Sequence, residues 1–276
     1  MIRALFFDLD GTLLNSRKRV DDASVCAIRK ARQKGISVWF ASARSPRLDQ
    51  TLLWNDREFS LFDGGIYCNG ACAFMDGAMT YSFMDADTVR DIIGIVSAFP
   101  KVHMSLHMPE EGYAFNFEPD ESMDRTWGLR NARVMQITEE AIETTTKILV
   151  FYDHLTDAAQ MLPKELTDAF YQKIADRANF YVTDQGKTVQ FAHRGVSKLS
   201  SIRSVQKMMN LSDDEICVFG DDVNDLEMIS YYKHSVAMGN GAEAVKKKAG
   251  FVTKGNDENG IAFAIENYIL DGEDDQ

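Results

Sequence analysis

The chain has 276 residues, of which 45% are hydrophobic, and it carries a formal net charge of -12. This length is enough for one large domain or two smaller domains with a buried core. The acidic balance argues against a general nucleic-acid-binding protein, because such proteins present a basic surface.

The start of the chain predicts a strand–helix–strand unit of a parallel sheet. An apolar run at residues 4–7 leads directly into Asp8, as expected of a buried strand. A helical pattern covers residues 21–34 and ends at Gly35. A second apolar run at residues 36–41 supplies the next strand.

Turn signals follow the second strand. Ser45 and Pro46 predict the cap and the first position of another helix. Residues 64–69 predict a third short strand. Asp76 and Gly77 lie between two short strand-like runs, and they predict the turn of a β-hairpin.

The regular pattern stops near residue 84 and resumes near residue 190. The segment between them mixes strands and helices without alternation, which is typical of an α+β domain. We therefore predict an inserted domain at residues 85–189 and a first domain made of residues 1–84 and 190–276. Within the insertion, helices are expected at residues 87–99 and within 157–176, and strands at residues 101–108, 113–117, 145–152, 180–183 and 188–191.

After the insertion the chain returns to alternating strands and helices. Residues 215–219 predict a strand that ends in Gly220-Asp221-Asp222. The alternation predicts an α/β fold with a doubly wound parallel sheet. Residues 271–276 are an acidic tail that we expect to be frayed. The other predicted elements are helices at residues 196–208, 242–249 and 260–270 and short strands at residues 235–238 and 251–253.

Hydropathy and cysteine spacing indicate in which cellular compartment the protein is expected. The sequence has no run of about 20 apolar residues, so no membrane span is expected. It also lacks the cationic region and apolar stretch of a signal peptide. We expect a cytoplasmic monomer or homodimer without membrane or nucleic-acid partners. Four cysteines without metal-ligand spacing are interpreted as core thiols, namely Cys26, Cys68, Cys72 and Cys217.

Two carboxylates, Asp8 and Asp10, follow the first strand at once. Ligands of open α/β sheets bind at the carboxyl ends of the strands, so Asp8 is delivered to a site. The two carboxylates repel each other, and a hard divalent cation such as Mg²⁺ is the usual compensation. A carboxylate supported in this way can be a nucleophile that forms an aspartyl-phosphate. The plainer alternative is an acidic turn in solvent.

Several motifs in this sequence carry a resemblance to a known family. Asp8-Leu9-Asp10-Gly11-Thr12 resembles the first motif of the haloacid dehalogenase-like (HAD) phosphohydrolases. Gly220-Asp221-Asp222-Val223-Asn224-Asp225 resembles their fourth motif, Gly-Asp-x-x-Asn-Asp. Ser42-Ala43-Arg44 and Asn69-Gly70-Ala71 are similar to segments of the Cof-type branch, subfamily IIB. The resemblance implies a Rossmann-like core with an inserted C2-type cap.

The resemblance also implies roles for the acidic residues. It assigns Asp8 as the nucleophile and Asp10 as the general acid and base. Haloacid dehalogenases do not use a second aspartate in this way, so Asp10 favours phosphoryl chemistry over cleavage of a carbon–halogen bond. Asp8, Asp10 and Asp221 are the implied metal ligands. Asp225 is expected to hold Lys198 or the surroundings of the metal.

Polar and cationic side chains complete the expected site. Ser42 is expected to hydrogen-bond the transferring phosphoryl group, and Lys198 to neutralise its charge. Arg44 would grip the substrate phosphate, Asn69 would touch the substrate, and Asn224 would orient substrate or metal-bound water. The alternatives are an ordinary helix cap for Ser42, a solvated charge for Arg44 and a turn-forming residue for Asn69.

These observations favour a Mg²⁺-dependent phosphohydrolase of small phosphorylated metabolites, with the cap reading the leaving group. Sugar phosphates are the first expected substrate class, and pyridoxal phosphate, flavin-pathway phosphates and nucleotides stay open. One alternative is a phosphotransferase or phosphomutase with the same nucleophile. The other is a non-enzymatic protein that binds phosphorylated metabolites.

Overall fold

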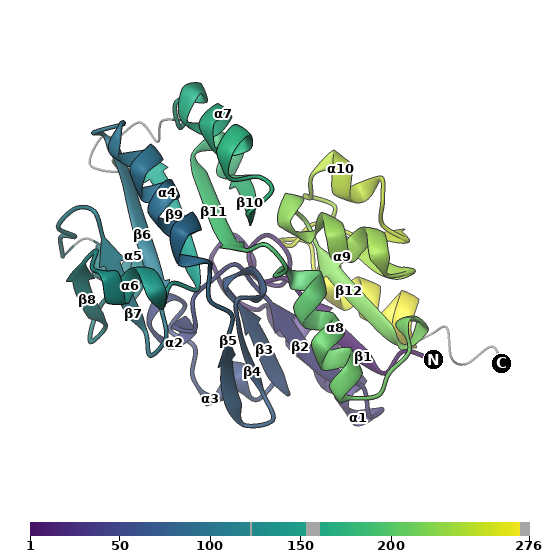
Figure 1. Ribbon diagram of the computed structural model, residues 1–276. Helices are drawn as coiled ribbons and strands as arrows, with labels where there is room; N and C mark the ends of the chain where they lie inside the picture. Colours follow the sequence, from purple (N-terminus) through teal and green to yellow (C-terminus); the bar gives the residue numbers. More distant parts are fainter. Residues whose placement is uncertain (122, 153–160, 271–276) are drawn as a thin grey trace. The chain divides into compact units, whose positions relative to one another are not determined.

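The first strand, β1 (Ala4–Phe7), lies inside an eight-stranded sheet of order β14-β13-β12-β1-β2-β3-β4-β5 (Figure 1). It pairs in parallel with β12 on one side and with β2 on the other. All four of its side chains are buried, which explains its uninterrupted apolar sequence. The other strands are β2 (Ser37–Ala41), β3 (Gly64–Tyr67), β4 (Cys72–Met75), β5 (Ala78–Tyr81), β12 (Ile216–Gly220), β13 (His234–Ala237) and β14 (Phe251–Val252).

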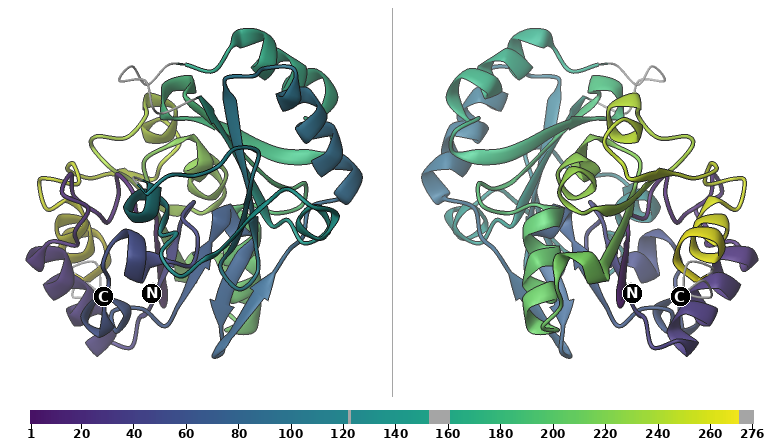
Figure 2. Two further views of the ribbon diagram at one scale, coloured as in Figure 1. Left: turned by 90° about the vertical axis from the view of Figure 1, so that its left-hand side faces the viewer. Right: turned by 90° about the vertical axis from the view of Figure 1, so that its right-hand side faces the viewer.

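Helices cover both faces of this sheet (Figure 2). Phe6 packs in one cluster with Ile202 and Val205 of α8, while α1 and α11 pack together on the opposite face. The predicted α/β fold with a doubly wound sheet is therefore confirmed. The helices are α1 (Asp22–Gln33), α3 (Asp56–Phe59), α8 (Lys198–Met208), α9 (Leu226–Tyr231), α10 (Glu243–Lys246) and α11 (Gly260–Ala264), which continues as a π-helical stretch at Ile265–Leu270.

Local signals in the sequence account for several boundaries. The Asp21 side chain caps α1 by accepting a hydrogen bond of 2.7 Å from the backbone N–H of Ser24. Asp76 and Gly77 have φ angles of +51° and +75° and connect β4 to β5. The predicted helix and hairpin are both confirmed.

A second sheet of six strands has the order β10-β11-β9-β6-β7-β8. All its neighbouring strands run antiparallel except β7 and β8, which run parallel. This mixture with helices is the predicted α+β pattern. Its elements are β6 (Val102–Met108), β7 (Gly112–Phe115), β8 (Arg133–Gln136), β9 (Lys147–Tyr152), β10 (Ala178–Thr183), β11 (Thr188–His193), α4 (Ala86–Ser97), α5 (Met123–Trp127), α6 (Glu139–Glu143) and α7 (Lys164–Lys173).

The two faces of β6 differ in character, as its alternating sequence predicts. Leu106 lies in the apolar cluster that α4 and α7 form on one face. On the other face, the His103 ring lies 4.0 Å from the Phe117 ring, and the His107 ring lies 4.9 Å from the Tyr113 ring, centroid to centroid. Aromatic packing therefore buries much of this second face.

The described residues are 1–121, 123–152 and 161–270, and they form two compact units. The first unit comprises Met1–Ala43, Leu52–Thr80 and the chain from Lys198, and the second comprises Arg44–Thr51 and Tyr81–Ser197. The start of the helix expected within residues 157–176, and the tail at residues 271–276, lie outside the described residues. The predicted boundaries at 84/85 and 189/190 lie within eight residues of two of these divisions.

The segment Arg44–Thr51 departs from the sequence prediction. It packs with the second unit, because Arg47 forms an ion pair with Glu111 and the Tyr113 hydroxyl donates a 2.8 Å hydrogen bond to Ser45 Oγ. The prediction of a helix that starts at Pro46 with Ser45 as its cap is wrong. Helix α2 (Leu48–Thr51) begins two residues after Pro46. The Ser45 hydroxyl instead accepts the hydrogen bond from Tyr113.

The burial of the cysteines and the length of the helices bear on two predictions from the sequence. The four cysteines are thiols, and three of them are buried, whereas Cys26 is exposed on α1. The prediction of a core position is therefore wrong for Cys26. Within residues 1–121, 123–152 and 161–270, no helix is long and apolar enough to cross a membrane.

Candidate active site

Three adjacent strands of the first sheet deliver polar side chains to one edge. Asp8 follows β1, Ser42 follows β2 and Asp221 follows β12. Backbone pairing continues past the strands, since Asp8 N–H donates to Phe219 O at 3.0 Å and Ser42 N–H donates to Ile66 O at 2.8 Å. The strand ends thus bring residues from distant parts of the chain together.

Lys198 is the first residue of α8, and its ammonium group is almost completely buried. Its Nζ lies 2.5 Å from Asp8 Oδ1 and 2.6 Å from Asp225 Oδ1. Burial lowers the pKa of Lys198, but the charges of Asp225 and Asp8 outweigh this effect and raise the pKa above its ordinary value. Lys198 is therefore a fixed positive charge between two carboxylates.

Asp225 organises the loop that follows β12. Its Oδ2 accepts hydrogen bonds from the backbone N–H groups of Asp221, at 2.9 Å, and Asp222, at 3.2 Å. A Cβ atom on Gly220 would lie 2.5 Å from the Asp225 Cβ, so the loop needs glycine at this position. The Asp222 side chain instead caps the 3₁₀ turn η4 (Val223–Asp225) by accepting from Val223 N–H.

Asp221 is positioned by the turn that follows Asp8. Its Oδ1 accepts a 2.7 Å hydrogen bond from Thr12 Oγ1, and Gly11 lies directly against its Oδ2. Burial and the nearby Asp225 charge raise the pKa of Asp221 to about 7, although the Thr12 hydrogen bond acts in the opposite direction. Asp221 is thus a carboxylate whose charge is poorly compensated by the protein.

One oxygen each of Asp8, Asp221 and Asp225 lies within 4.8 Å of the others. Burial raises the pKa of Asp8 well above its usual range; Lys198 lowers it, and the charges of Asp225 and Asp221 raise it further. One lysine therefore does not neutralise this group of carboxylates. A hard cation with oxygen ligands, such as Mg²⁺, fits both the donor set and the excess negative charge.

Two buried asparagines join the edge of the site. Asn224 Nδ2 donates a 3.0 Å hydrogen bond to Asn69 Oδ1. The backbone N–H of Asn69 donates to the carbonyl oxygen of Ser42 at 2.9 Å. Asn69, Ser42 and Asn224 thus form a chain of contacts beside the carboxylates.

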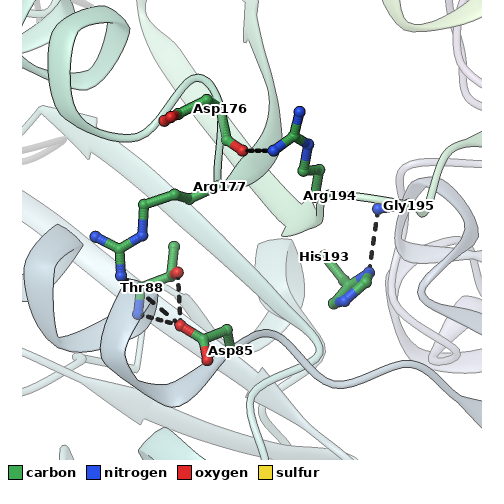
Figure 3. A pocket seen from close by; sticks show the side chains of 7 residues that line it. All are labelled: Asp85, Thr88, Asp176, Arg177, His193, Arg194 and Gly195. Atoms are coloured by element: carbon green, nitrogen blue, oxygen red, sulfur yellow. Dashed lines mark hydrogen bonds and ion pairs between the residues drawn. The ribbon is translucent and has the colours of Figure 1, made fainter.

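A cavity of about 610 Å³ also lies within the second unit. Figure 3 shows its two arginines already engaged: Arg177 lies beside Asp85, and Arg194 donates to the carbonyl oxygen of Asp176. Arg177 is thus paired with a carboxylate, and Arg194 with a backbone carbonyl. The concentration of buried charge in the first unit is the better candidate for an active site.

The comparisons with known proteins agree with the motifs. The family described as haloacid dehalogenase-like hydrolases matches residues 5–265. The chain belongs to this family. The resemblance inferred from the sequence is therefore confirmed, and the protein is a hydrolase of the HAD superfamily.

Relatives and solved structures add to this assignment. The chain is 25% identical to the chloroplastic endoribonuclease YBEY of Arabidopsis thaliana over 96% of its own length, but it spans only 46% of that protein. It is 24% identical to the 5-amino-6-(5-phospho-D-ribitylamino)uracil phosphatase YitU of Bacillus subtilis (strain 168), covering 95% of this chain and 96% of that one. The solved HAD subclass IIB sugar phosphatase BT4131 shares the fold, with a TM-score of 0.79, 23% identity and coverage of 96% and 98%.

Asp10 and Arg44 were also predicted as site residues. The sequence placed Asp10 among the metal ligands, but its carboxylate forms an ion pair with Lys18, with 2.6 Å between Nζ and Oδ1. Asp225 is the third carboxylate of the group, and metal binding by Asp10 stays a prediction. Arg44 is half-buried and belongs to the second unit.

Other contacts were missed by the motif-based reasoning. Lys18 lies in a loop where it has a left-handed φ of +59°, and it contacts Asp10. Asn240 Nδ2 donates a 2.8 Å hydrogen bond to Gly11 O and so supports the turn beside Asp221. Neither residue belongs to a motif of regular spacing, and the run of cations at residues 17–19 was the only available signal.

Proposed function

We propose that this HAD hydrolase is a Mg²⁺-dependent phosphatase that removes phosphate from small phosphorylated metabolites through an aspartyl-phosphate on Asp8. The observation that supports this most directly is the buried group of Asp8, Asp221 and Asp225 around Lys198. Burying three carboxylates around one lysine is energetically unfavourable. This favours a bound cation and a role for the group in phosphoryl transfer.

Asp8 and Asp221 are the residues that would hold the metal, and Asp225 would keep them in place through Lys198 and the loop backbone. When bound, the metal supplies positive charge that offsets the carboxylates and the phosphoryl oxygens. The donors are all carboxylate oxygens, which suits Mg²⁺ rather than a softer metal.

Asp8 is the nucleophile in this proposal. Lys198 holds Oδ1 of Asp8, so Oδ2 is the oxygen that attacks phosphorus. The P–O bond to the leaving group breaks as the bond to Asp8 forms. Lys198 and the Ser42 hydroxyl stabilise the charge on the transferring phosphoryl group.

Asp10 transfers the protons. It lies two residues after Asp8, beyond β1, and its side chain is partly open to solvent. Asp10 first donates a proton to the leaving oxygen. It then takes a proton from the water that attacks the aspartyl-phosphate, which releases inorganic phosphate and restores Asp8.

Sugar phosphates remain the first expected substrates. BT4131 is described as a sugar phosphatase and YitU as a phosphatase of a phosphoribitylamino compound, and both names describe phosphate monoesters of polyhydroxylated carbon chains. The chain is similar to both along nearly its whole length. Arg44, two residues after Ser42, stays a proposed substrate-binding residue.

Phosphate release from a panel of sugar phosphates, flavin-pathway phosphates, pyridoxal phosphate and nucleotides tests this function. The native chain, Asp8→Asn and the control Asp22→Asn are assayed with Mg²⁺ and with a chelator. Asp22 is an exposed carboxylate of the same unit, at the start of α1. We expect Mg²⁺-dependent release by the native chain and by Asp22→Asn, and none by Asp8→Asn.

Product analysis separates the alternatives. An isomerised phosphate ester without free phosphate would replace the hydrolase proposal with a phosphomutase. Binding of the same compounds without any turnover would indicate a non-enzymatic binding protein. Release that is unchanged in Asp8→Asn would exclude Asp8 as the nucleophile.

A further inference from the structure

The turn between β3 and β4 has an unusual backbone. Its three residues form the 3₁₀ turn η1 (Cys68–Gly70), and all three have left-handed φ angles: +53° for Cys68, +53° for Asn69 and +105° for Gly70. Left-handed backbone is unfavourable for residues other than glycine, although asparagine tolerates it better than most. Two such residues in succession are unfavourable for the backbone, and this turn also has contacts with its surroundings.

Those contacts reach three separate segments of the site. Asn69 N–H donates to Ser42 O at 2.9 Å, and Asn69 Oδ1 accepts from Asn224 Nδ2 at 3.0 Å. Ser201 Oγ donates to Gly70 O at 2.9 Å. Ser42 follows β2, Asn224 lies in η4, and Ser201 lies one turn beyond Lys198 on α8. The turn therefore links the segments that carry the phosphoryl-binding serine, the metal-site loop and the catalytic lysine.

We propose that the Cys68–Gly70 turn is a positioning element that holds these three segments in register, with Asn69 acting through Asn224 rather than on the substrate. The expected effects of this positioning role on the kinetics rest on the proposed phosphatase function. It assigns Asn69 a different role from the substrate contact that the sequence suggested. Ser201 is a further positioning residue, because its hydrogen bond to Gly70 O connects α8, near Lys198, to the turn.

The second unit contains a turn that serves as a matched comparison. The 3₁₀ turn η2 (Asp184–Gly186) joins β10 to β11 with φ angles of +52°, +58° and +88°. Its middle residue, Gln185, has φ and ψ of 58° and 36°, against 53° and 30° for Asn69. Gln185 is exposed, whereas Asn69 is buried. The two turns share a backbone conformation and differ in their side-chain contacts.

The first experiment compares Asn69→Gly with Gln185→Gly. Glycine accepts the left-handed backbone in both turns, so only the side-chain contacts are removed. Amide hydrogen exchange is measured at residues 221–225 in metal-free protein. We expect faster exchange there in Asn69→Gly and native-like exchange in Gln185→Gly. This readout needs neither turnover nor metal.

The second experiment measures steady-state phosphate release by the same variants. Loss of a group that supports catalytic residues typically costs about 10- to 100-fold in activity. We expect Asn69→Gly to lose activity in this range through kcat, with KM within about twofold of the native value. The double variant Asn69→Gly/Asn224→Ala should be no slower than Asn224→Ala alone, because both changes break one contact.

Ser201→Ala and Ser204→Ala form a second matched pair on α8. Ser204 Oγ donates a 3.2 Å hydrogen bond to the carbonyl oxygen of Ser200 within the helix, whereas Ser201 Oγ donates to Gly70 O. We expect Ser201→Ala to lower kcat and Ser204→Ala to leave it native.

The possible outcomes distinguish the two proposals. If the native chain releases no phosphate, the proposed function fails, and the exchange measurement still tests the positioning role. Unchanged exchange at residues 221–225 in Asn69→Gly would overturn the positioning role, whatever the activity. A loss confined to KM would also overturn it, because it would show that Asn69 contacts the substrate directly.

Discussion

Gly11 lies so close to Asp221 that a Cβ atom on its backbone would stand 2.3 Å from Oδ2 of Asp221. Gly11 also has a left-handed φ of +81°. The turn after Asp8 therefore needs glycine for two reasons, one conformational and one steric. The steric reason links the first motif of the chain to the fourth.

These two reasons can be separated with Gly11→Ala and Gly35→Ala. Gly35 has a φ of +82°, and a Cβ atom there would meet nothing within 4 Å. Alanine is unfavourable in the left-handed conformation, so both variants should lose about 1–2 kcal/mol of unfolding free energy. Only Gly11→Ala displaces Asp221, so it should lose about 10- to 100-fold in apparent Mg²⁺ affinity and in phosphate release. Equal Mg²⁺ titrations for the two variants would contradict the steric link.

Removal of the buried lysine should affect stability as well as activity. Lys198→Met leaves Asp8 and Asp225 without their shared cation. Breaking a buried ion pair typically costs about 3–5 kcal/mol, and we expect a loss of this size in metal-free protein at pH 8. Chemical denaturation measures it, with the exposed Lys233→Met as a control that should change little. Phosphate release by Lys198→Met should fall by at least about 100-fold.

Metal binding should depend on pH through Asp221. Its pKa in metal-free protein is raised to about 7, so a cation must displace a proton below that pH. We expect the apparent Mg²⁺ affinity to rise between pH 5 and pH 8 and to level off above about pH 8. A calorimetric titration at several pH values measures this. A pH-independent affinity would show that Asp221 is already ionised without metal.

The same raised pKa has a consequence for metal-free stability. A group whose pKa is higher in the folded state stabilises the fold at low pH, and that contribution is lost as pH rises through the folded pKa. For Asp221 the window extends from about 4 to about 7. We expect the melting temperature of metal-free protein to fall across this window, less steeply in Asp221→Asn, and Mg²⁺ to restore it most strongly above pH 7.

Lys18 should influence the rate more than the stability. Its ion pair with Asp10 is exposed, and such pairs contribute up to about 1 kcal/mol. Lys18→Met should therefore leave the unfolding free energy nearly unchanged and lower phosphate release by up to about fivefold. Lys30→Met is the matched control, since Lys30 pairs with Glu266 at similar exposure. If both variants keep the native rate, Lys18 has no part in the reaction.

The location of the carboxylate group followed from a simple rule of parallel sheets. Asp8, Ser42 and Asp221 each come directly after an apolar strand, and the carboxyl ends of parallel strands meet at one edge. The strand predictions were accurate here because buried parallel strands leave long apolar runs in the sequence. Lys198 needed the motif resemblance in addition, because a lysine at the start of a helix is common.

The same rule could not predict contacts between side chains that are far apart in the sequence. Nothing in the local pattern around Ser45 reveals that Tyr113 binds its hydroxyl, or that Arg47 pairs with Glu111. Helix α2 begins at Leu48, and these contacts join Arg44–Thr51 to the rest of the second unit. The partner of Asp10 was missed for a related reason, since it depends on the conformation of the loop that carries Lys18.

The central position of β1 determines when the site can be assembled during protein synthesis. β1 is translated well before β12, which is one of its two neighbouring strands. The lysine that pairs with Asp8 is 190 positions further along the chain. Until β12 and α8 have emerged, one edge of β1 and the Asp8 carboxylate have no native partners. Folding of the first unit must therefore wait until β12 and α8 have been translated, while the second unit, whose long segment ends at Ser197, is complete earlier.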